Sequence, residues 1–312
     1  MSTAPDFVSF ARDAGLIVNH IPADGKVHRY PTETKPRKRN GAALLTYDGL
    51  FGWCMDYSGG AEVLKWKANG DTPRPVIDHA AIERRKSEAR RKVIRATLAA
   101  RAFWGRCKPL RGGHQYLSSH ALDMIGCDGL KIDAEGWLVV PAMLDGKLMS
   151  VQRIGPDGEK RFWPGASMKG ASYLIDRKSA TVSVIVEGLA TGLAIFAAVP
   201  QVRVIVGFDC GNLGRVKIPR RGLVVVAADN DSSTEERTGK NPGLIAAREA
   251  AKKLGCGITY PEGIIGSDWC DMRIERLSIL RLERPKARDS ALRGAADAEL
   301  AGAILKNAVF VK

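Results

Sequence analysis

Short apolar runs alternate with segments of helical spacing in the second half of the chain. Four runs predict buried strands: VSVIV (182–186), VRVIV (202–206), LVVVAA (223–228) and GITYP (257–261). Segments with helical spacing, near 190–198 and 241–254, follow the first and third of these runs. Strands that are apolar on both faces and separated by helices predict a mostly parallel sheet covered on both sides. The predicted fold class is therefore α/β, with flanking helices.

The hydrophobic pattern differs between residues 108 and 178. There, GWLVVPAMLDGKLMSVQRIGPDGEKRFWPG predicts two or three short strands joined by D-G and P-D-G turns, and SYLI predicts one more. A loop and a short helix in GGHQYLSSHALDMIG precede these strands. This region is expected to form a small mixed α+β subdomain in front of the parallel sheet.

The first 75 residues predict a small β-rich module. A short amphipathic helix at FVSFARDAGL is followed by turns rich in Gly, Pro and aromatic residues. The module also contains Tyr30, Tyr47, Phe51, Trp53 and Tyr57, which suit either stacking with bases or a small aromatic core. The predicted organisation is a β-rich module (1–75), a basic helical linker (76–107), the mixed subdomain (108–178), the parallel-sheet domain (179–275) and a helical C-terminal tail (276–312).

Composition adds a polyanionic partner to this picture. The 312 residues hold 48 Lys plus Arg against 34 Asp plus Glu, a net charge of +14, and nucleic acid is the expected partner. Two basic segments are the candidate DNA-binding surfaces: Lys35, Arg37, Lys38 and Arg39 in the first module, and Arg84, Arg85 and Arg91 in the long helix. Aromatic residues beside the first segment suit stacking with single-stranded bases. Alternatively, the first segment is a solvated charge run above a small aromatic core, and the helix only links two domains through solvent.

Two classes of protein are disfavoured. No apolar run approaches the roughly 20 residues that span a bilayer, and the first residues lack a signal sequence, so a cytoplasmic protein without a membrane partner is expected. Six cysteines are scattered singly, at positions 54, 107, 127, 210, 256 and 270. Without a C-x-x-C pair, neither a zinc ribbon nor a disulfide framework is expected.

Carboxylates follow the predicted parallel strands. Glu187 comes after VSVIV, Asp229 and Asp231 come after LVVVAA, and Asp268 and Asp271 lie in GSDWCD further on. Ligands of parallel α/β sheets bind beyond the carboxyl ends of the strands, and Mg²⁺ prefers a few carboxylate ligands together with substrate phosphates. The pattern predicts a divalent-metal site, Mg²⁺ or Mn²⁺. The alternative is that each carboxylate caps a helix or a turn.

These acidic residues also carry a family resemblance. The Glu-Gly pair at 187–188, the D-x-D at 229–231 and the D-x-x-D at 268–271 resemble the Toprim domain of DnaG-type primases, topoisomerases and some nucleases. VEGLATGLA is similar to the form found in phage and plasmid primases. Upstream, HQYLSSHAL, WLVVPAMLDGKLMSVQRIGPDGEKRFWPG and KGASYLI resemble the region that precedes Toprim in those primases. The resemblance covers about residues 108–275.

The resemblance implies roles for individual residues. Glu187 would be the catalytic acid, Asp229 and Asp231 would act with it as catalytic metal ligands, and Asp268 would be an accessory acid at the metal. Arg153, Lys160 and Lys169 fall where the family places basic residues that handle template or nucleotide phosphate. These assignments rest on the matching motif positions alone.

The function implied by the resemblance is a DNA primase of a phage, plasmid or other mobile element. It would synthesise short oligonucleotides on single-stranded DNA from nucleoside triphosphates, with a separate replicative helicase as a further partner. The chain departs from the family because residues 1–75 hold only Cys54, so a cysteine-ligated zinc ribbon is not expected. It also lacks a P-loop motif. Alternative functions are a Toprim-type metal-dependent DNA nuclease and a non-catalytic replication accessory that binds single-stranded DNA.

Overall fold

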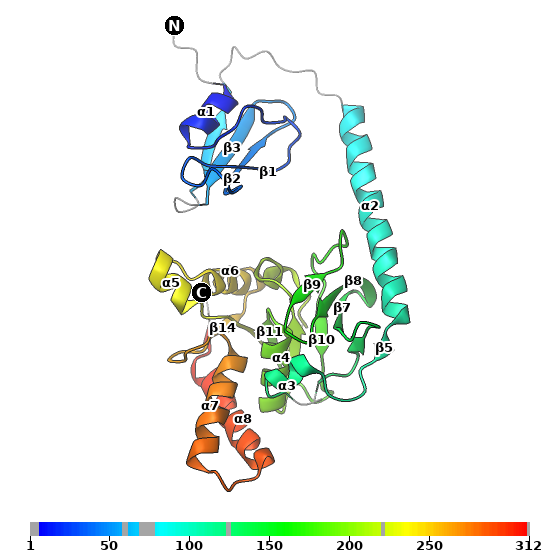
Figure 1. Ribbon diagram of the computed structural model, residues 1–312, viewed down its shortest axis with the longest axis vertical. Helices are drawn as coiled ribbons and strands as arrows, with labels where there is room; N and C mark the ends of the chain where they lie inside the picture. The colour runs from blue at the N-terminus through cyan, green and yellow to red at the C-terminus, as the bar shows by residue number, and fades with distance from the viewer. Residues whose placement is uncertain (1–5, 58–61, 69–78, 123–125, 220–221, 311–312) are drawn as a thin grey trace. The chain divides into compact units, whose positions relative to one another are not determined.

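The computed structural model describes residues 6–57, 62–68, 79–122, 126–219 and 222–310 (Figure 1). Residues 1–5 of the predicted N-terminal module and 76–78 of the predicted linker lie outside these ranges. The chain divides into two compact units, Met1–Glu88 and Ala89–Lys312. The boundary falls within α2 (His79–Arg106), a continuous helix of 28 residues. Among the described helices, none has the length and apolar character needed to cross a bilayer.

The first unit is a four-stranded antiparallel sheet with one helix packed on it. Its strands, in the order β1-β2-β3-β4, are β1 (His28–Tyr30), β2 (Gly41–Leu45), β3 (Phe51–Asp56) and β4 (Leu64–Lys67). The helix α1 (Phe7–Asp13) begins at Asp6, whose carboxylate accepts a hydrogen bond from the backbone N–H of Ser9. Phe7 and Ala11 of this helix are buried against the sheet.

The core of this unit contains aromatic rings, but four of the five that the sequence analysis considered do not pack in it; Phe7 lies against Phe10 and Trp66 instead. The buried residues of this core are Phe7, Ala11, Leu16, Val18, Ile21, Ala43 and Cys54. Phe51 and Tyr57 are 40% and 45% exposed, and only Tyr30 of the five predicted aromatic residues packs against this core. The reason is that α1 covers a single face of a small sheet, and alternate strand residues therefore face solvent.

The second unit begins with a five-stranded antiparallel sheet of order β5-β6-β7-β8-β9. Its strands are β5 (Lys108–Pro109), β6 (Lys131–Ile132), β7 (Leu138–Leu144), β8 (Lys147–Ile154) and β9 (Lys160–Phe162). The hairpin between β7 and β8 turns at Asp145 and Gly146, which have φ values of 50° and 72°. Two successive positive φ angles are those of the tight turn that D-G sequences favour.

A six-stranded sheet of order β10-β12-β11-β13-β14-β15 follows. Its strands are β10 (Tyr173–Ile175), β11 (Val182–Val186), β12 (Val202–Val206), β13 (Leu223–Ala227), β14 (Gly257–Thr259) and β15 (Val309–Phe310). The four central strands are parallel, and β10 and β15 pair antiparallel at the two edges. The predicted α/β class with a mostly parallel sheet is confirmed.

Helices cover both faces of this sheet because its strands are apolar on both sides. Val184 and Val186 of β11 pack on the face that carries α4 (Leu189–Ala198), whereas Ile185 packs with α6 (Pro242–Leu254) on the other. Figure 1 shows α4 and α6 on opposite sides of β11. The core on the α4 face also includes Leu138 and Ile154 of the antiparallel sheet, so the two sheets of this unit share one hydrophobic core.

The residues expected to form a C-terminal tail pack against the parallel sheet. The helices α7 (Trp269–Glu283) and α8 (Asp289–Lys306) form a hairpin, and Leu300 and Ile304 of α8 are buried in the core beside α4. The side chain of Thr259 donates a hydrogen bond to the carbonyl oxygen of Ile304. After α8 the chain returns as β15 beside β14.

Candidate active site

Acidic residues follow three neighbouring parallel strands. Glu187 follows β11, Asp209 follows β12 by three residues, and Asp229 follows β13 by two. Because β11 lies between β12 and β13 and all three run in the same direction, their carboxyl ends meet at one edge of the sheet.

The strand-to-helix turn after β11 places Glu187 at this edge. Gly188 is the N-cap of α4, with extended backbone angles and no side-chain cap. The backbone carbonyl of Glu187 accepts a hydrogen bond from the N–H of Phe208, which holds it against the end of β12. Phe208 itself has a φ of 74°, a left-handed conformation that is rare for a bulky residue and costs about 1–3 kcal/mol. Strain of this size is typical of functional sites.

Burial and neighbouring carboxylates raise the pKa of Asp229 and of Glu187. Burial, followed by the charges of Asp268, Glu187 and Asp231, raises the pKa of Asp229 to about 8. Burial and then the charge of Asp209 also raise the pKa of Glu187, while Lys160 lowers it. A buried group of like charges is unfavourable by itself and becomes stable when a cation binds among them.

One atom at this edge shows a specific need for such a cation. Oδ1 of Asp229 is buried and has no hydrogen-bond partner among the described residues. Orphaned buried oxygens are rare, and a carboxylate oxygen beside other carboxylates is suited to a hard divalent ion. Within the described ranges, however, no three His, Cys, Asp or Glu side chains are grouped closely enough to form a ready metal site. The donor types fit Mg²⁺ or Mn²⁺, but the side chains are not drawn together around a common point.

The two remaining acidic residues of the predicted metal site also make structural hydrogen bonds. Asp231 is the N-cap of α5 (Ser232–Thr238), and its Oδ2 accepts a hydrogen bond of 2.9 Å from the N–H of Gly243. Asp268 caps α7 through the N–H groups of Cys270 and Asp271, and its Oδ2 accepts a hydrogen bond from Thr191. Each therefore has fewer free lone pairs than Asp229. Both remain predicted metal ligands.

A cavity of about 200 Å³ opens beside these carboxylates. It is lined by Tyr116, His120, Gln152, Lys160, Phe162, Glu187, Gly188, Ala190, Thr191, Phe208, Asp229 and Asp268. Lys160 is the cation of this wall, and a Cβ added at Gly188 would lie 3.9 Å from its Nζ. Of the three basic residues predicted to handle phosphate, the structure brings Lys160 to the carboxylates.

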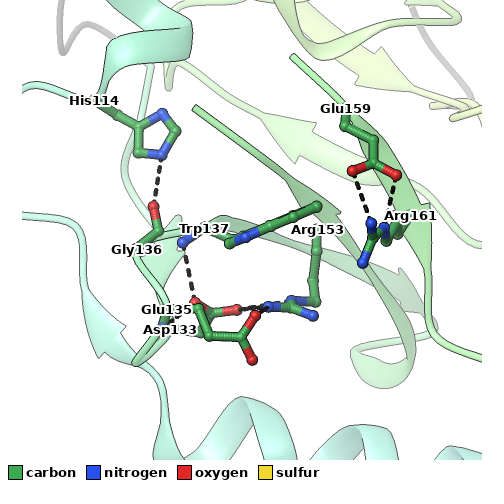
Figure 2. Close-up of polar contacts among 8 residues, drawn as sticks. All are labelled: His114, Asp133, Glu135, Gly136, Trp137, Arg153, Glu159 and Arg161. Atoms are coloured by element: carbon green, nitrogen blue, oxygen red, sulfur yellow. Dashed lines mark hydrogen bonds and ion pairs between the residues drawn. The ribbon is translucent and has the colours of Figure 1, made fainter. Parts of the chain in front are cut away.

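Arg153 is held elsewhere by two carboxylates. Figure 2 shows its guanidinium turned toward Asp133 and Glu135, with hydrogen bonds of 2.7 and 2.8 Å. It also lies over the ring of Trp137, at 4.7 Å from the centroid. Because Arg153 pairs with Arg161 and Lys160 pairs with Ile154, Arg153 and Lys160 are on opposite faces of the sheet. Lys169 is an exposed side chain after β9 and does not line the cavity.

The predicted DNA-binding residues are on exposed segments. Lys35, Arg37, Lys38 and Arg39 lie on the connection between β1 and β2, and all four side chains are exposed. Arg84, Arg85 and Arg91 are exposed along α2. The backbone around Lys35 and Lys38 is held in turns by hydrogen bonds to Thr32 and Lys35. Their roles stay predictions.

The sequence analysis missed several residues at this edge. Asp209 follows an apolar strand, as Glu187 does, and that position was its only signal. Gln152, Phe162 and Phe208 line the cavity but carry no motif. Their placement depends on strand register, which the sequence does not reveal.

Comparison with known proteins identifies the class of domain. Residues 182–278 match the Toprim domain family. The chain thus contains a Toprim domain, built on the parallel sheet and the acidic edge described above.

The relatives found among curated proteins are primases. The chain is 30% identical over 285 residues to a DNA primase TraC from Escherichia coli. The aligned region covers 82% of this chain and 26% of that protein. A second DNA primase TraC from Escherichia coli is 28% identical over 294 residues, covering 84% of this chain and 20% of that protein. The chain therefore spans only a fifth to about a quarter of the length of these relatives. The resemblance to Toprim primases of the phage or plasmid type is confirmed.

Solved structures give more distant matches. The primase fragment of the bacteriophage T7 primase-helicase protein aligns with a TM-score of 0.39 at 12% identity, covering 80% of this chain and 94% of that one. The RNA polymerase domain of Mycobacterium tuberculosis primase DnaG aligns with a TM-score of 0.32 at 15% identity, covering 68% and 85%.

Proposed function

We propose that this protein is a DNA primase that synthesises short oligonucleotides on single-stranded DNA by metal-dependent nucleotidyl transfer. The observation that carries the proposal is the buried, unpartnered Oδ1 of Asp229 beside Glu187 and within the field of Lys160. Such an arrangement suits a divalent cation and a phosphate chain together. The similarity to the TraC primases supports the same reaction class.

In this proposal each residue has a defined task. Glu187, Asp229 and Asp231 would hold Mg²⁺ or Mn²⁺, with Asp268 adjacent, and the bound cation would offset the negative charge that develops on the transferred phosphoryl group. Lys160 would bind phosphate oxygens of the incoming nucleotide. Glu187, whose pKa is raised by burial and by Asp209, would accept the proton of the attacking 3′-hydroxyl at its carboxylate.

The basic segments would hold the template. The exposed cations between β1 and β2 and those of α2 would neutralise backbone phosphates of single-stranded DNA. Replacing Arg37 and Lys38 together by Ala is expected to weaken binding of mixed-sequence single strands and to flatten its salt dependence by about 1–1.5 units of log slope. Unchanged salt dependence in fluorescence anisotropy would remove this segment from the proposal.

Primer synthesis is the direct test. The protein is incubated with mixed-sequence single-stranded DNA, labelled nucleoside triphosphates and Mg²⁺ or Mn²⁺, and short oligonucleotides are resolved on a gel. Products are expected with the wild type and not with Glu187→Gln, while Asp128→Asn, a change at an exposed aspartate, leaves them unchanged. Metal-dependent cleavage of DNA that is lost in Glu187→Gln would instead establish the nuclease. DNA binding with neither activity would establish the accessory protein.

A further inference from the structure

In the N-terminal unit, the face of the sheet opposite α1 carries a row of aromatic side chains. Cys54 of β3 is buried in the core beneath α1, so the odd-numbered residues of this strand point to the other side. These residues are Phe51, Trp53 and Met55, and Tyr57 follows directly after the strand. Phe51 is 40% exposed and Tyr57 is 45% exposed. A contiguous row of exposed rings, unlike a single one, indicates a binding surface, here called the aromatic face.

Two lysines lie beside these rings. Trp53 pairs with Lys65 of β4, and Phe51 pairs with Lys67, so both lysines are on the aromatic face. Both side chains are exposed, and within the part of the chain that the structure describes neither forms an ion pair. The sequence analysis did not single out these lysines, because only the register between β3 and β4 places them next to the rings.

A third cation reaches the aromatic face from the other edge of the sheet. Arg29 of β1 pairs with Ala42, which in turn pairs with Met55. The guanidinium of Arg29 lies 4.3 Å from the centroid of the Tyr57 ring and donates a hydrogen bond to the carbonyl oxygen of Arg39. These two contacts hold Arg29 against the sheet and leave it less able to pair with the edge of a base.

The four described strands place no carboxylate on the aromatic face. Its remaining positions are Ala42, Leu44 and Met55, as the pairing of β2 with β3 shows. Asp56, the acidic residue of β3, points to the opposite face. The strands also contribute no Asn, Gln, Ser or Thr to the aromatic face, the types that read base edges besides charged residues. The face therefore combines stacking surface and positive charge with little capacity to read a sequence.

We propose that the aromatic face binds single-stranded DNA by base stacking, without selecting its sequence. Bases stack on Phe51, Trp53 and Tyr57, while Lys65 and Lys67 neutralise phosphates of the same strand. Alternate strand residues are about 6.5–7 Å apart, so neighbouring rings take separate bases. Duplex DNA does not fit, because its bases are already stacked on one another. The inference rests on the proposed function in that this strand is the template.

Binding in the absence of nucleotides and metal tests the aromatic face separately from synthesis. Fluorescence anisotropy on the full chain compares labelled oligonucleotides of equal length: two unrelated mixed sequences, their duplexes, RNA of the same sequence and an abasic strand that has phosphates but no bases. The two sequences are expected to bind within about threefold of each other, and the abasic strand at least about tenfold more weakly. RNA is expected to bind no more tightly than DNA, because stacking does not involve the 2′-hydroxyl.

Substitutions on the two faces of the sheet assign the effect to individual rings. Phe51→Leu and Tyr57→Leu keep an apolar side chain without a ring, and each is expected to weaken mixed-sequence DNA about fivefold or more and the abasic strand not at all. Phe51→Tyr, which keeps the ring, is expected to bind as the wild type does. Phe10→Leu is the matched control, because Phe10 lies on α1 and packs with the core on the opposite face.

The lysines are tested by their effect on the backbone term. Lys65→Met combined with Lys67→Met is expected to weaken ordinary and abasic strands alike and to reduce the log slope of the salt dependence by about 1.4. An unchanged slope would remove the lysines from the proposal.

The outcomes separate this inference from the primase proposal. Equal affinity for abasic and ordinary strands would overturn stacking, and a preference above about tenfold for one sequence or for RNA would overturn sequence-tolerant binding of DNA. Equal weakening by Phe51→Leu and Phe10→Leu would also overturn the inference, since the effect would then be structural. If binding depends on the rings but no primers form, the aromatic face stands and the primase proposal fails alone. If primers form and Phe51→Leu and Tyr57→Leu bind as the wild type does, the aromatic face fails alone.

Discussion

The polar side chains on the two faces of the β8–β9 hairpin differ in whether they have partners. On one face, Arg153 forms ion pairs with Asp133 and Glu135, and Arg161 pairs with Glu159 (Figure 2). On the other, Lys160 and Gln152 make no hydrogen bond or ion pair within the described residues. Satisfied charges indicate a structural role, whereas unsatisfied polar groups beside a cavity indicate a ligand. Positive charge alone therefore does not distinguish phosphate-binding residues in this domain.

The acidic edge opposite Lys160 is where the largest effect is expected. Asp229→Asn removes the buried carboxylate but keeps its size, and primer synthesis is expected to fall about 10²–10³-fold, the loss typical of a preorganised electrostatic group. The measurement is the initial rate of oligonucleotide formation, with Asp128→Asn as the control. Synthesis within tenfold of the wild type would show that Asp229 is not required.

On the face that carries the ion pairs of Arg153 and Arg161, the expected effect is on stability. Arg153→Met leaves the carboxylate of Asp133, whose side chain is 4% exposed, without its charged partner, so the free energy of unfolding is expected to fall by about 3 kcal/mol. Urea unfolding measures this loss. Arg161→Met is the matched control, because its ion pair is exposed and screened by solvent and is expected to contribute little to stability. Equal losses in the two variants would contradict a special role for the Asp133 pair.

Lys160→Met tests the unpaired cation by the same type of substitution. The KM for nucleoside triphosphate is expected to rise about tenfold, because one charged contact to phosphate is lost, while unfolding by urea stays close to the wild type. Arg161→Met, its neighbour on the opposite face, is expected to leave KM unchanged. If both variants raise KM equally, the distinction between the two faces does not hold.

A smaller effect concerns the pH dependence of stability without metal. Asp229 has a pKa of about 8 in the folded protein against 3.8 for an ordinary aspartate, so the folded state holds its proton more tightly. The stabilisation from this proton is fully present below about pH 3.8 and is lost as the pH rises through about 8. Asp229→Asn is therefore expected to raise Tm by a few degrees at pH 8.5 in chelator, and by less at pH 6.

Thermal melts of the wild type and Asp229→Asn across this pH range provide the measurement. Adding Mn²⁺ at pH 8.5 is expected to raise the Tm of the wild type more than that of the variant, because the cation binds the ionised carboxylate. A Tm difference that does not change with pH would contradict the raised pKa.

The sequence predicted the parallel sheet because apolar runs on both faces of a strand have few other interpretations. It also predicted that Glu187 and Asp229 lie at the carboxyl edge of this sheet, since each comes at the end of such a run. It could not separate Arg153 from Lys160, because their faces depend on the register between β8 and β9. Asp209 was missed because one carboxylate after a strand is also the usual sign of a helix cap.

The N-terminal unit shows a different limit. The aromatic residues there were compatible with a core or with an exposed stacking surface. The exposure of Phe51 and Tyr57 follows from how many layers cover the sheet, and strand composition does not contain that information. Short runs of residues predict secondary structure well and predict burial only when every face is covered.

The packing of α8 against α4 has a consequence for how the protein emerges from the ribosome. Leu300 and Ile304 complete a core whose other members, such as Leu193, are translated about a hundred residues earlier. A nascent chain that has not yet reached α8 leaves that apolar surface open to water and to other chains. The residues of the acidic edge are therefore translated before the core beneath them is complete. The need for chaperones during synthesis should fall once α8 has left the exit tunnel.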